Sequence, residues 1–238
     1  MGKPEQAIVV AAGVGSRLRP LTEDKPKSLI EVGGESMLRR SLQLMVDQGI
    51  SDVVVVVGYR KEMIEDHVRE FPVTFVHNPF YGITNNMASL WFALSFMKGQ
   101  FIYSHSDIVY DPGLLSMLVN EPEDNVLLVE EKECGLEEMK VQVHDGCLVA
   151  SNKEIPKDKS FGEWTGLAKF SRDFGFELTS TIGSLIEQGS LMAYDTLAFT
   201  DLANRGQAIG ISSFTNLPWI EIDTAEDLKI ARELFSSV

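Results

Sequence analysis

The first half of the chain alternates continuous apolar runs with amphipathic segments. The runs over 6–12 and 52–58 are rich in β-branched residues and predict strands that are buried on both faces, as in a parallel sheet. Between them, residues 36–49 place Leu38 and Leu42 on one helical face and end in a glycine, which predicts a crossover helix. This order of strand, helix and strand indicates a βαβ unit.

The alternation continues as far as residue 107, after which the pattern changes. Further helices are expected over 61–71 and 85–97, and further strands over 73–78 and 100–107. Later strands are expected over 125–131, over 139–152 with a hairpin turn at Asp145 and Gly146, and over 164–171. Two helices around a turn at 188–190 are expected within 174–205, and a strand with a capped helix, marked by Thr224 and Asp227, within 218–235. These elements predict an α/β fold, a Rossmann-like doubly wound mixed sheet with an antiparallel extension in the second half.

The composition is that of a globular protein, and its charge narrows the classes of partner. The 238 residues are 44% hydrophobic and 24% charged, which excludes a disordered or fibrous chain. With 21 Lys and Arg against 35 Asp and Glu, the net charge of −14 would repel a nucleic-acid backbone. No apolar run approaches the length of a membrane span, and the two cysteines form neither a disulfide framework nor a metal-ligand pair. We therefore expect a cytoplasmic protein that binds neither nucleic acid nor membrane.

Much of the positive charge gathers in the segment that follows the first strand. This segment carries two glycines and four cations: Gly13, Gly15, Arg17, Arg19, Lys25 and Lys27. Glycines there let backbone N–H groups approach phosphate oxygens while the cations neutralise their charge, so the segment predicts a polyphosphate site. It matches neither a Walker A loop nor a dinucleotide fingerprint, because Gly15 is followed by Ser16 and no third glycine occupies Leu18. The alternative is a glycine turn with solvated basic side chains.

The segment Ala11–Thr22, followed by Pro26-Lys27, resembles the signature of the nucleotidyltransferases that activate sugar phosphates and related phosphates. Gly58-Tyr59, Asn85–Trp91, Asp107 and Glu221–Asp223 follow in the order that this family shows. The stretch Asn-Asn-x-x-Ser-Leu is similar to the branch that includes choline-phosphate cytidylyltransferases of the LicC type and 2-aminoethylphosphonate cytidylyltransferases. The resemblance implies the nucleotide-diphospho-sugar transferase fold, Mg²⁺ as the cofactor, and transfer of CMP from CTP with release of pyrophosphate.

The same resemblance implies roles for four charged residues. Lys27 matches the catalytic lysine on the α-phosphate, and Arg17 matches the residue on the β- and γ-phosphates. Asp107 and Asp223 match the two metal ligands, and each also ends a predicted strand, where carboxylates can face phosphates and Mg²⁺. The alternatives are a loop cap for Asp107 and a helix N-cap for Asp223. Asp111, which precedes a proline and a glycine, is interpreted as a turn residue.

The nucleotide is expected to contact the glycine segment and the motifs that follow it. Recognition of cytosine is assigned to amide and hydroxyl side chains and to backbone that excludes purines. The expected nucleotide-binding residues are Ala11, Ala12, Gly13, Gly15, Ser16, Arg17, Gly58, Tyr59, Asn85, Asn86 and Ser89. Helix capping is the alternative for the asparagines. The histidines at 67, 77, 105 and 144 form no metal-ligand pattern and are interpreted as structural.

The acceptor is expected to meet the second half of the chain. By resemblance, Lys153 matches the lysine on the acceptor's phosphate, with Lys140 as the alternative. The sequence Asn152-Lys153-Glu154 departs from the Glu-Lys-Pro of sugar-activating relatives, which argues against a hexose. An amine-bearing acceptor, phosphocholine or 2-aminoethylphosphonate, would suit a cation–π wall and the nearby carboxylates. The candidates are Trp164 for the wall and Glu130, Glu131, Glu133, Glu137, Glu138 and Glu163 for the carboxylates, the alternative being a core tryptophan and a solvated acidic face.

One domain is expected over 1–238, in which 1–120 mainly binds the nucleotide and 121–238 mainly binds the acceptor. Two other functions are compatible with the sequence: a hexose-1-phosphate nucleotidyltransferase that uses UTP, dTTP or GTP, and a non-catalytic regulatory domain that binds a nucleotide. The charged set described above argues against the second, because binding alone needs no cations aimed at the α-phosphorus. A homodimer is compatible with the sequence as well.

Overall fold

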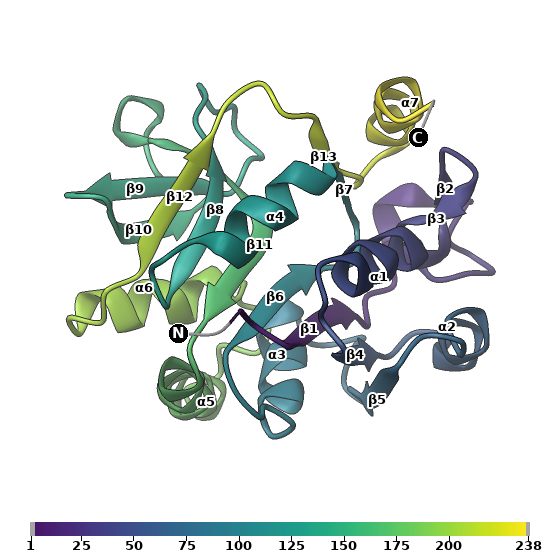
Figure 1. The fold of residues 1–238 in the computed structure, drawn as a ribbon, viewed down its shortest axis with the longest axis horizontal. Helices are drawn as coiled ribbons and strands as arrows, with labels where there is room; N and C mark the ends of the chain where they lie inside the picture. The colour runs from purple at the N-terminus through teal and green to yellow at the C-terminus, as the bar shows by residue number, and fades with distance from the viewer. Residues whose placement is uncertain (1–2, 237–238) are drawn as a thin grey trace.

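A mixed sheet of nine strands forms the centre of the molecule in the computed structural model, which describes residues 3–236 (Figure 1). Its first part is parallel: β1 (Gln6–Ala11) lies between β4 (Asp52–Val57) and β6 (Phe101–His105), and β5 (Val73–His77) pairs with the outer side of β4. The chain direction of the crossovers reverses between β1 and β6. Open α/β sheets bind ligands at such a switch point, beyond the carboxyl ends of the strands.

The second half extends the same sheet, as expected, largely through antiparallel pairs. β11 (Gly162–Phe170) pairs with β6 on one side and with β8 (Val126–Glu130) on the other. Beyond β8 lie β12 (Gly210–Phe214), then β10 (Cys147–Asn152) and β9 (Lys140–His144). The last two form the expected hairpin, whose turn at Asp145 and Gly146 has positive φ at both residues. The sheet therefore runs without interruption across residue 120, while the division into two binding halves stays a prediction.

Helices cover both faces of the sheet, which explains the unbroken valine run of β4. One face packs against α1 (Met37–Asp47), α2 (Lys61–His67) and α4 (Pro112–Asn120), and the other against α3 (Asn86–Leu94), α5 (Arg172–Glu187) and α6 (Thr196–Asn204). The valines of β4 alternate between these two cores. None of the helices between residues 3 and 236 has both the length and the apolar character to span a bilayer.

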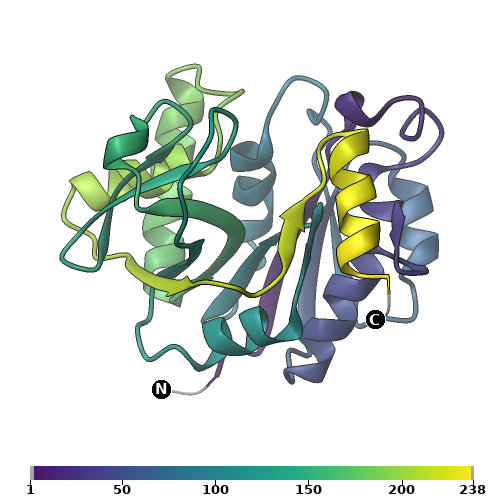
Figure 2. The same ribbon diagram turned by 90° about the horizontal axis from the view of Figure 1, so that it is seen from above.

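A third, smaller core lies beside the main sheet. Figure 2 shows α7 (Ala225–Leu234), in yellow, packed beside the first segments of the chain, in purple. Two short antiparallel pairs border this region: β2 (Glu31–Val32) with β3 (Glu35–Ser36), and β7 (Ile108–Tyr110) with β13 (Trp219–Glu221). The second pair joins the segment after β6 to the segment before α7, and so brings two distant strand ends together.

Several elements were not anticipated from the pattern, among them α4 and the strands β2, β3, β7 and β12, and the helices expected over 61–71 and 85–97 end earlier than expected. Residues 108–120 contain a Pro-Gly step, which is typical of a turn. In the structure Pro112 occupies the first turn of α4 instead. Asp111 caps this helix, and its Oδ1 accepts a hydrogen bond from Gly113 N at 2.7 Å. β7 and β12 are short or serine-rich and give weak strand signals. The helix expected over 61–71 ends at His67, and the next residue, Val68, has φ −120° and ψ 19°, outside the helical region.

The capping box at the start of α7 gives a first testable prediction. Thr224 Oγ1 accepts a hydrogen bond from Asp227 N at 3.2 Å, and Asp227 Oδ2 accepts one from Thr224 N at 2.7 Å. Thr224→Ala removes the first of these caps and should lower the free energy of unfolding by about 1 kcal/mol, measured by urea denaturation. Thr224→Ser keeps the hydroxyl and is the control. Equal stability of the two variants would contradict this account of the helix start.

Candidate active site

A polar cavity of about 260 Å³ opens beyond the carboxyl ends of β1 and β6, at the switch point of the sheet. Segments from both halves of the chain form its wall. Of the residues that sequence reasoning assigned to the nucleotide, the lining contains Ala11, Ala12, Gly13, Gly15, Ser16, Arg17, Asn85, Asn86 and Ser89. Lys27, Asp107 and Asp223 complete this set. The structure thus gathers most of the predicted nucleotide site around one cavity.

The glycine segment begins where β1 ends and is shaped by close packing against Lys27. Gly15 has φ +66°, and a Cβ placed on it would lie 2.7 Å from Lys27 Cβ. The carbonyl oxygen of Gly15 accepts a hydrogen bond from Thr22 Oγ1 at 2.8 Å, which closes the loop. Glycine is therefore required here both for its left-handed backbone and for the passage of the lysine side chain. Arg19, by contrast, is exposed outside the cavity.

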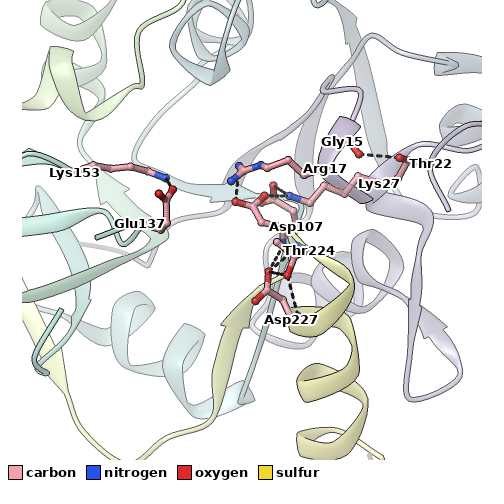
Figure 3. A network of polar contacts seen from close by, with 10 residues as sticks. Gly15, Arg17, Thr22, Lys27, Asp107, Glu137, Lys153, Thr224 and Asp227 are labelled. Carbon is pink, nitrogen blue, oxygen red and sulfur yellow. Dashed lines mark hydrogen bonds and ion pairs between the residues drawn. The ribbon is translucent and has the colours of Figure 1, made fainter. Parts of the chain in front are cut away.

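Four charged side chains from three distant parts of the sequence meet in the cavity (Figure 3). Lys27 Nζ lies 2.8 Å from Asp107 Oδ2 and 2.5 Å from Asp223 Oδ1. Arg17 Nη2 lies 2.6 Å from Asp223 Oδ2, so the two cations share this carboxylate. Asp223 is not the N-cap of α7, since Thr224 holds that position. The structure brings the predicted phosphate cations and the predicted metal ligands into direct contact.

The carboxylates keep Lys27 charged. Burial alone would lower the pKa of this lysine, but the negative charges of Asp107 and Asp223 more than offset that effect and raise its pKa above the ordinary value. Burial alone would likewise raise the pKa of Asp107, and the charge of Lys27 reverses the effect and lowers it. At neutral pH the cavity therefore holds an ammonium group between two carboxylates. The second oxygen of Asp107, Oδ1, is buried and has no hydrogen-bond partner within residues 3–236.

Sequence reasoning missed several residues of the cavity, above all His105 and Glu221. The ligand atoms of His105, Asp107 and Glu221 all lie within 4.8 Å of one another. Burial and the charges of Asp107 and Asp223 raise the pKa of Glu221 to about 7. A signal was present for these two residues: His105 and Glu221 each stand two positions before a predicted metal ligand, and alternate residues of a strand point to the same side.

The imidazole of His105 is held by the buried carboxylate of the residue that caps α6. Asp195 Oδ2 lies 2.9 Å from His105 Nε2 and accepts a hydrogen bond from Tyr103 Oη at 2.6 Å. Burial alone would lower the pKa of His105, whereas the charge of Asp195 and its hydrogen bond raise it to about 9. The interpretation of His105 as a structural residue was therefore incomplete, because this side chain also lines the cavity. Tyr81, Thr84 and Tyr194 are further lining residues that had not been assigned.

The asparagine stretch lies at one wall of the cavity. Asn85 caps α3, its side chain accepting from Asn86 N at 2.9 Å, as the alternative interpretation proposed. Asn86 Oδ1 accepts from Asp195 N at 3.2 Å, and Ser89 Oγ accepts from Asn78 Nδ2 at 3.0 Å. All three assigned residues also face the cavity, so capping and lining occur together.

Gly58 and Tyr59 do not belong to the cavity lining in the described part of the chain, contrary to expectation. A Cβ at Gly58 would lie 2.7 Å from both the Ala12 carbonyl oxygen and Tyr81 Cβ, so this glycine allows two wall segments to pack closely. Tyr59 Oη donates to the carbonyl oxygen of Glu23 at 2.6 Å. Both residues therefore lie next to the wall of the cavity without lining it.

A smaller cavity adjoins the first and carries the predicted acceptor lysine. Arg17, Asp223 and Tyr194 border both cavities, and Glu137, Lys153 and Trp164 line the smaller one. Lys153 Nζ lies 3.3 Å from Glu137 Oε2, and Figure 3 shows this pair reaching toward Arg17 from the opposite side. Trp164 forms part of the wall but is 3% exposed, and its indole N–H donates to the Leu167 carbonyl oxygen.

Two residues assigned to the acceptor lie elsewhere. Lys140 is buried, and its ammonium donates to the backbone carbonyl oxygens of Leu136 and Lys153, which removes it from contact with a ligand. Glu163 precedes Trp164 on β11 and therefore points to the other face of the strand, where its carboxylate lies 2.6 Å from Lys132 Nζ. Neither residue lines a cavity next to Arg17 within the described chain.

The chain is similar to known transferases, among them a cytidylyltransferase of almost the same length. The CTP:phosphoglutamine cytidylyltransferase of Campylobacter jejuni is 27% identical in an alignment 254 residues long. This alignment covers 95% of this chain and 99% of that protein. The bifunctional IPC transferase and DIPP synthase of Aquifex aeolicus is 30% identical over 237 residues, which cover 96% of this chain but only 51% of that protein.

Solved structures show the same fold. The inositol-1-phosphate CTP transferase from T. maritima superimposes with a TM-score of 0.82 at 24% identity, covering 99% of this chain and 96% of that chain. The CTP:phosphocholine cytidylyltransferase LicC from Streptococcus pneumoniae gives a TM-score of 0.81 at 24% identity over 96% of this chain and 98% of that chain. A family model described as the MobA-like NTP transferase domain matches residues 7–161, more than half of the sequence. The chain belongs to this family, the MobA-like NTP transferase domains.

Proposed function

We propose that this enzyme transfers CMP from CTP to a small phosphate or phosphonate that bears an amine, with release of pyrophosphate. The observation that carries the proposal is the convergence of Lys27, Asp107 and Asp223 at the end of the glycine segment. The choice of CTP is supported by the Campylobacter relative, which is named for CTP and spans almost the full chain. The choice of a non-hexose acceptor is supported by the departure at 152–154 from the pattern of sugar-activating relatives.

Transfer of a nucleotidyl group is chiefly a problem of position and charge. An oxygen of the acceptor's phosphate attacks the α-phosphorus of CTP, the new P–O bond forms as the bond to the β-phosphate oxygen breaks, and pyrophosphate leaves. Arg17 and Lys27 supply positive charge along the triphosphate, and Lys27 stays protonated throughout because its pKa is raised. A phosphate acceptor is already largely ionised near neutral pH, its second pKa being about 6, so the reaction needs no protein base.

The carboxylates at the centre of the cavity fit a magnesium ion. Asp107 presents a buried Oδ1 that has no hydrogen-bond partner within residues 3–236, although its other oxygen pairs with Lys27. Mg²⁺ prefers such carboxylate oxygens together with phosphate oxygens and water. We propose that Asp107 and Asp223 hold Mg²⁺, as expected from the sequence. When bound, the ion would neutralise charge on the triphosphate and on the departing pyrophosphate.

The wall formed by Asn85, Asn86 and Ser89 is proposed to face the cytosine base. Amide and hydroxyl groups can pair with both the donor and the acceptor positions of a cytosine edge. Tyr81, which packs against Gly58, takes the position in the wall that was expected for Tyr59. At the other end, Glu137, Tyr194 and Trp164 give the smaller cavity the carboxylate and the aromatic surface that an ammonium group favours.

A matrix of nucleotides and acceptors tests the proposal. CTP, UTP, dTTP, GTP and ATP are each combined with phosphocholine, 2-aminoethylphosphonate and glucose 1-phosphate, with and without Mg²⁺, and pyrophosphate release is measured. We expect turnover with CTP and an amine-bearing acceptor, in the presence of Mg²⁺ only. Turnover with glucose 1-phosphate and UTP, dTTP or GTP would instead support the hexose-1-phosphate enzyme. Tight nucleotide binding without any turnover would support the regulatory domain.

A further inference from the structure

We propose that Glu137 determines specificity by binding the ammonium group of the acceptor, and that Lys140 is the positioning residue that holds Glu137 opposite Lys153. The proposal rests on the proposed function and adds to it the side chain that distinguishes an amine-bearing acceptor from a neutral one. It also gives a role to the buried lysine that makes no contact with a cavity.

The smaller cavity carries an ion pair at its edge. Lys153 Nζ and Glu137 Oε2 lie 3.3 Å apart at its edge and neutralise each other. The Lys153 side chain is the more buried of the two, with 23% exposed against 85% for Glu137, and its ammonium also lies 5.8 Å from the centre of the Tyr194 ring. Lys153 therefore faces the interior of the cleft, and Glu137 stands at the rim.

An acceptor that binds in the smaller cavity breaks this ion pair. A phosphate group that takes the ammonium of Lys153 leaves Glu137 without a partner and close to further negative charge. An acceptor that carries an ammonium beside its phosphate supplies the missing partner, so two ion pairs replace one. A neutral alkyl phosphate supplies none and leaves the two anions in repulsion. Because Glu137 is largely exposed, the difference is modest, about fivefold in affinity, as for other exposed ion pairs.

The buried Lys140 connects the two backbone segments that carry this ion pair. Glu137 lies in the segment between β8 and β9, and Lys153 follows the end of β10. The ammonium of Lys140 donates to the carbonyl oxygen of Leu136 at 3.3 Å and to that of Lys153 at 2.6 Å. Lys140 thereby joins the backbone beside Glu137 to the backbone of Lys153. Lys140 is 2% exposed, so solvent screens these bonds little.

Two acceptors of equal size test the assignment of Glu137. Phosphoethanolamine and n-propyl phosphate differ by an ammonium in place of a methyl group, and kcat/KM is measured for each at saturating CTP. The unaltered enzyme should prefer phosphoethanolamine. Glu137→Gln should lower that preference about fivefold, because KM for phosphoethanolamine rises when its ammonium loses a partner and KM for n-propyl phosphate falls when the repulsion is relieved, with KM for CTP unchanged. The control is Glu138→Gln, which alters the neighbouring carboxylate outside both cavities.

The positioning role of Lys140 is tested by comparing a variant that removes its hydrogen-bond donor with one that keeps a donor. Lys140→Met should raise KM for both acceptors without changing KM for CTP, and Lys140→Gln, which keeps a donor, should restore part of the loss. A loss of thermal stability with no change in acceptor KM would show that Lys140 is merely structural. If Glu137→Gln preferred phosphoethanolamine over n-propyl phosphate as strongly as the unaltered enzyme does, the specificity role of Glu137 would be overturned. These failures differ from failure of the proposed function, in which the unaltered enzyme releases no pyrophosphate from CTP with any acceptor.

Discussion

Lys27→Met is expected to lower kcat by about 1,000-fold while KM for CTP changes far less. The ammonium of Lys27 lies between Asp107 and Asp223 and is the most buried cation of the cavity, with 12% of its side chain exposed. Removing one preorganised donor that stabilises the charge of a transition state costs about 10² to 10³ in kcat. Methionine has a similar length and leaves the packing against Gly15 largely intact. Steady-state pyrophosphate release at saturating acceptor measures the effect.

The control for this variant lies two residues away. Lys25 belongs to the same segment but does not line the cavity, so Lys25→Met should retain activity within about twofold of the unaltered enzyme. Lys27→Met also leaves two neighbouring carboxylates without their shared cation, and its melting temperature at pH 7 should fall below that of Lys25→Met. Equal activity of the two variants would contradict the role assigned to Lys27.

Asp107→Asn and Asp223→Asn should each lower activity at least about 100-fold and should move the Mg²⁺ dependence to higher concentration. An amide oxygen is a weaker ligand than a carboxylate, and the loss of one negative charge also reduces the attraction for a divalent ion. Activity is measured as Mg²⁺ is titrated. Mn²⁺ binding in the presence of CTP, followed by electron paramagnetic resonance, gives a readout that does not depend on turnover.

Asp111→Asn is the matched control for the metal ligands. Asp111 stands four residues after Asp107, but its side chain caps α4 and asparagine caps a helix equally well. This variant should bind Mn²⁺ and turn over as the unaltered enzyme does. An unaltered Mg²⁺ dependence in both Asp107→Asn and Asp223→Asn would remove the basis for assigning the ion to these carboxylates.

The parallel half of the fold could be predicted from local pattern because its signals are strong and independent. The valine run of 52–58 fits a strand covered on both faces, and Ser36 and Gly49 mark both ends of the helix before it. The glycines and cations after β1 likewise indicate a phosphate site before any fold is known. Asp107 and Asp223 could be proposed because both end a strand.

The rest depends on contacts between distant segments. The position of Glu221 follows from the pairing of β13 with β7, for which the local sequence gives no register. Gly58 has the sequence features of a ligand-binding glycine, and only its close packing against Ala12 and Tyr81 shows that it lies outside the cavity lining. A lysine on a short strand would ordinarily point to solvent. The burial of Lys140 becomes evident only when the turn at Lys153 is placed beside Leu136.

The continuity of the central sheet has a consequence for how such an enzyme can change its substrate. β6, which leads to Asp107, shares backbone hydrogen bonds with both β1 and β11, so strands of one continuous sheet border both cavities. The cavity proposed for the nucleotide lies beyond the ends of the parallel strands β1 and β6, whereas Glu137 and Lys153 lie on the segments that connect later strands. Connecting segments tolerate replacement better than the strands they join. Grafting those two segments from a relative should therefore exchange the acceptor while the machinery for the triphosphate is kept.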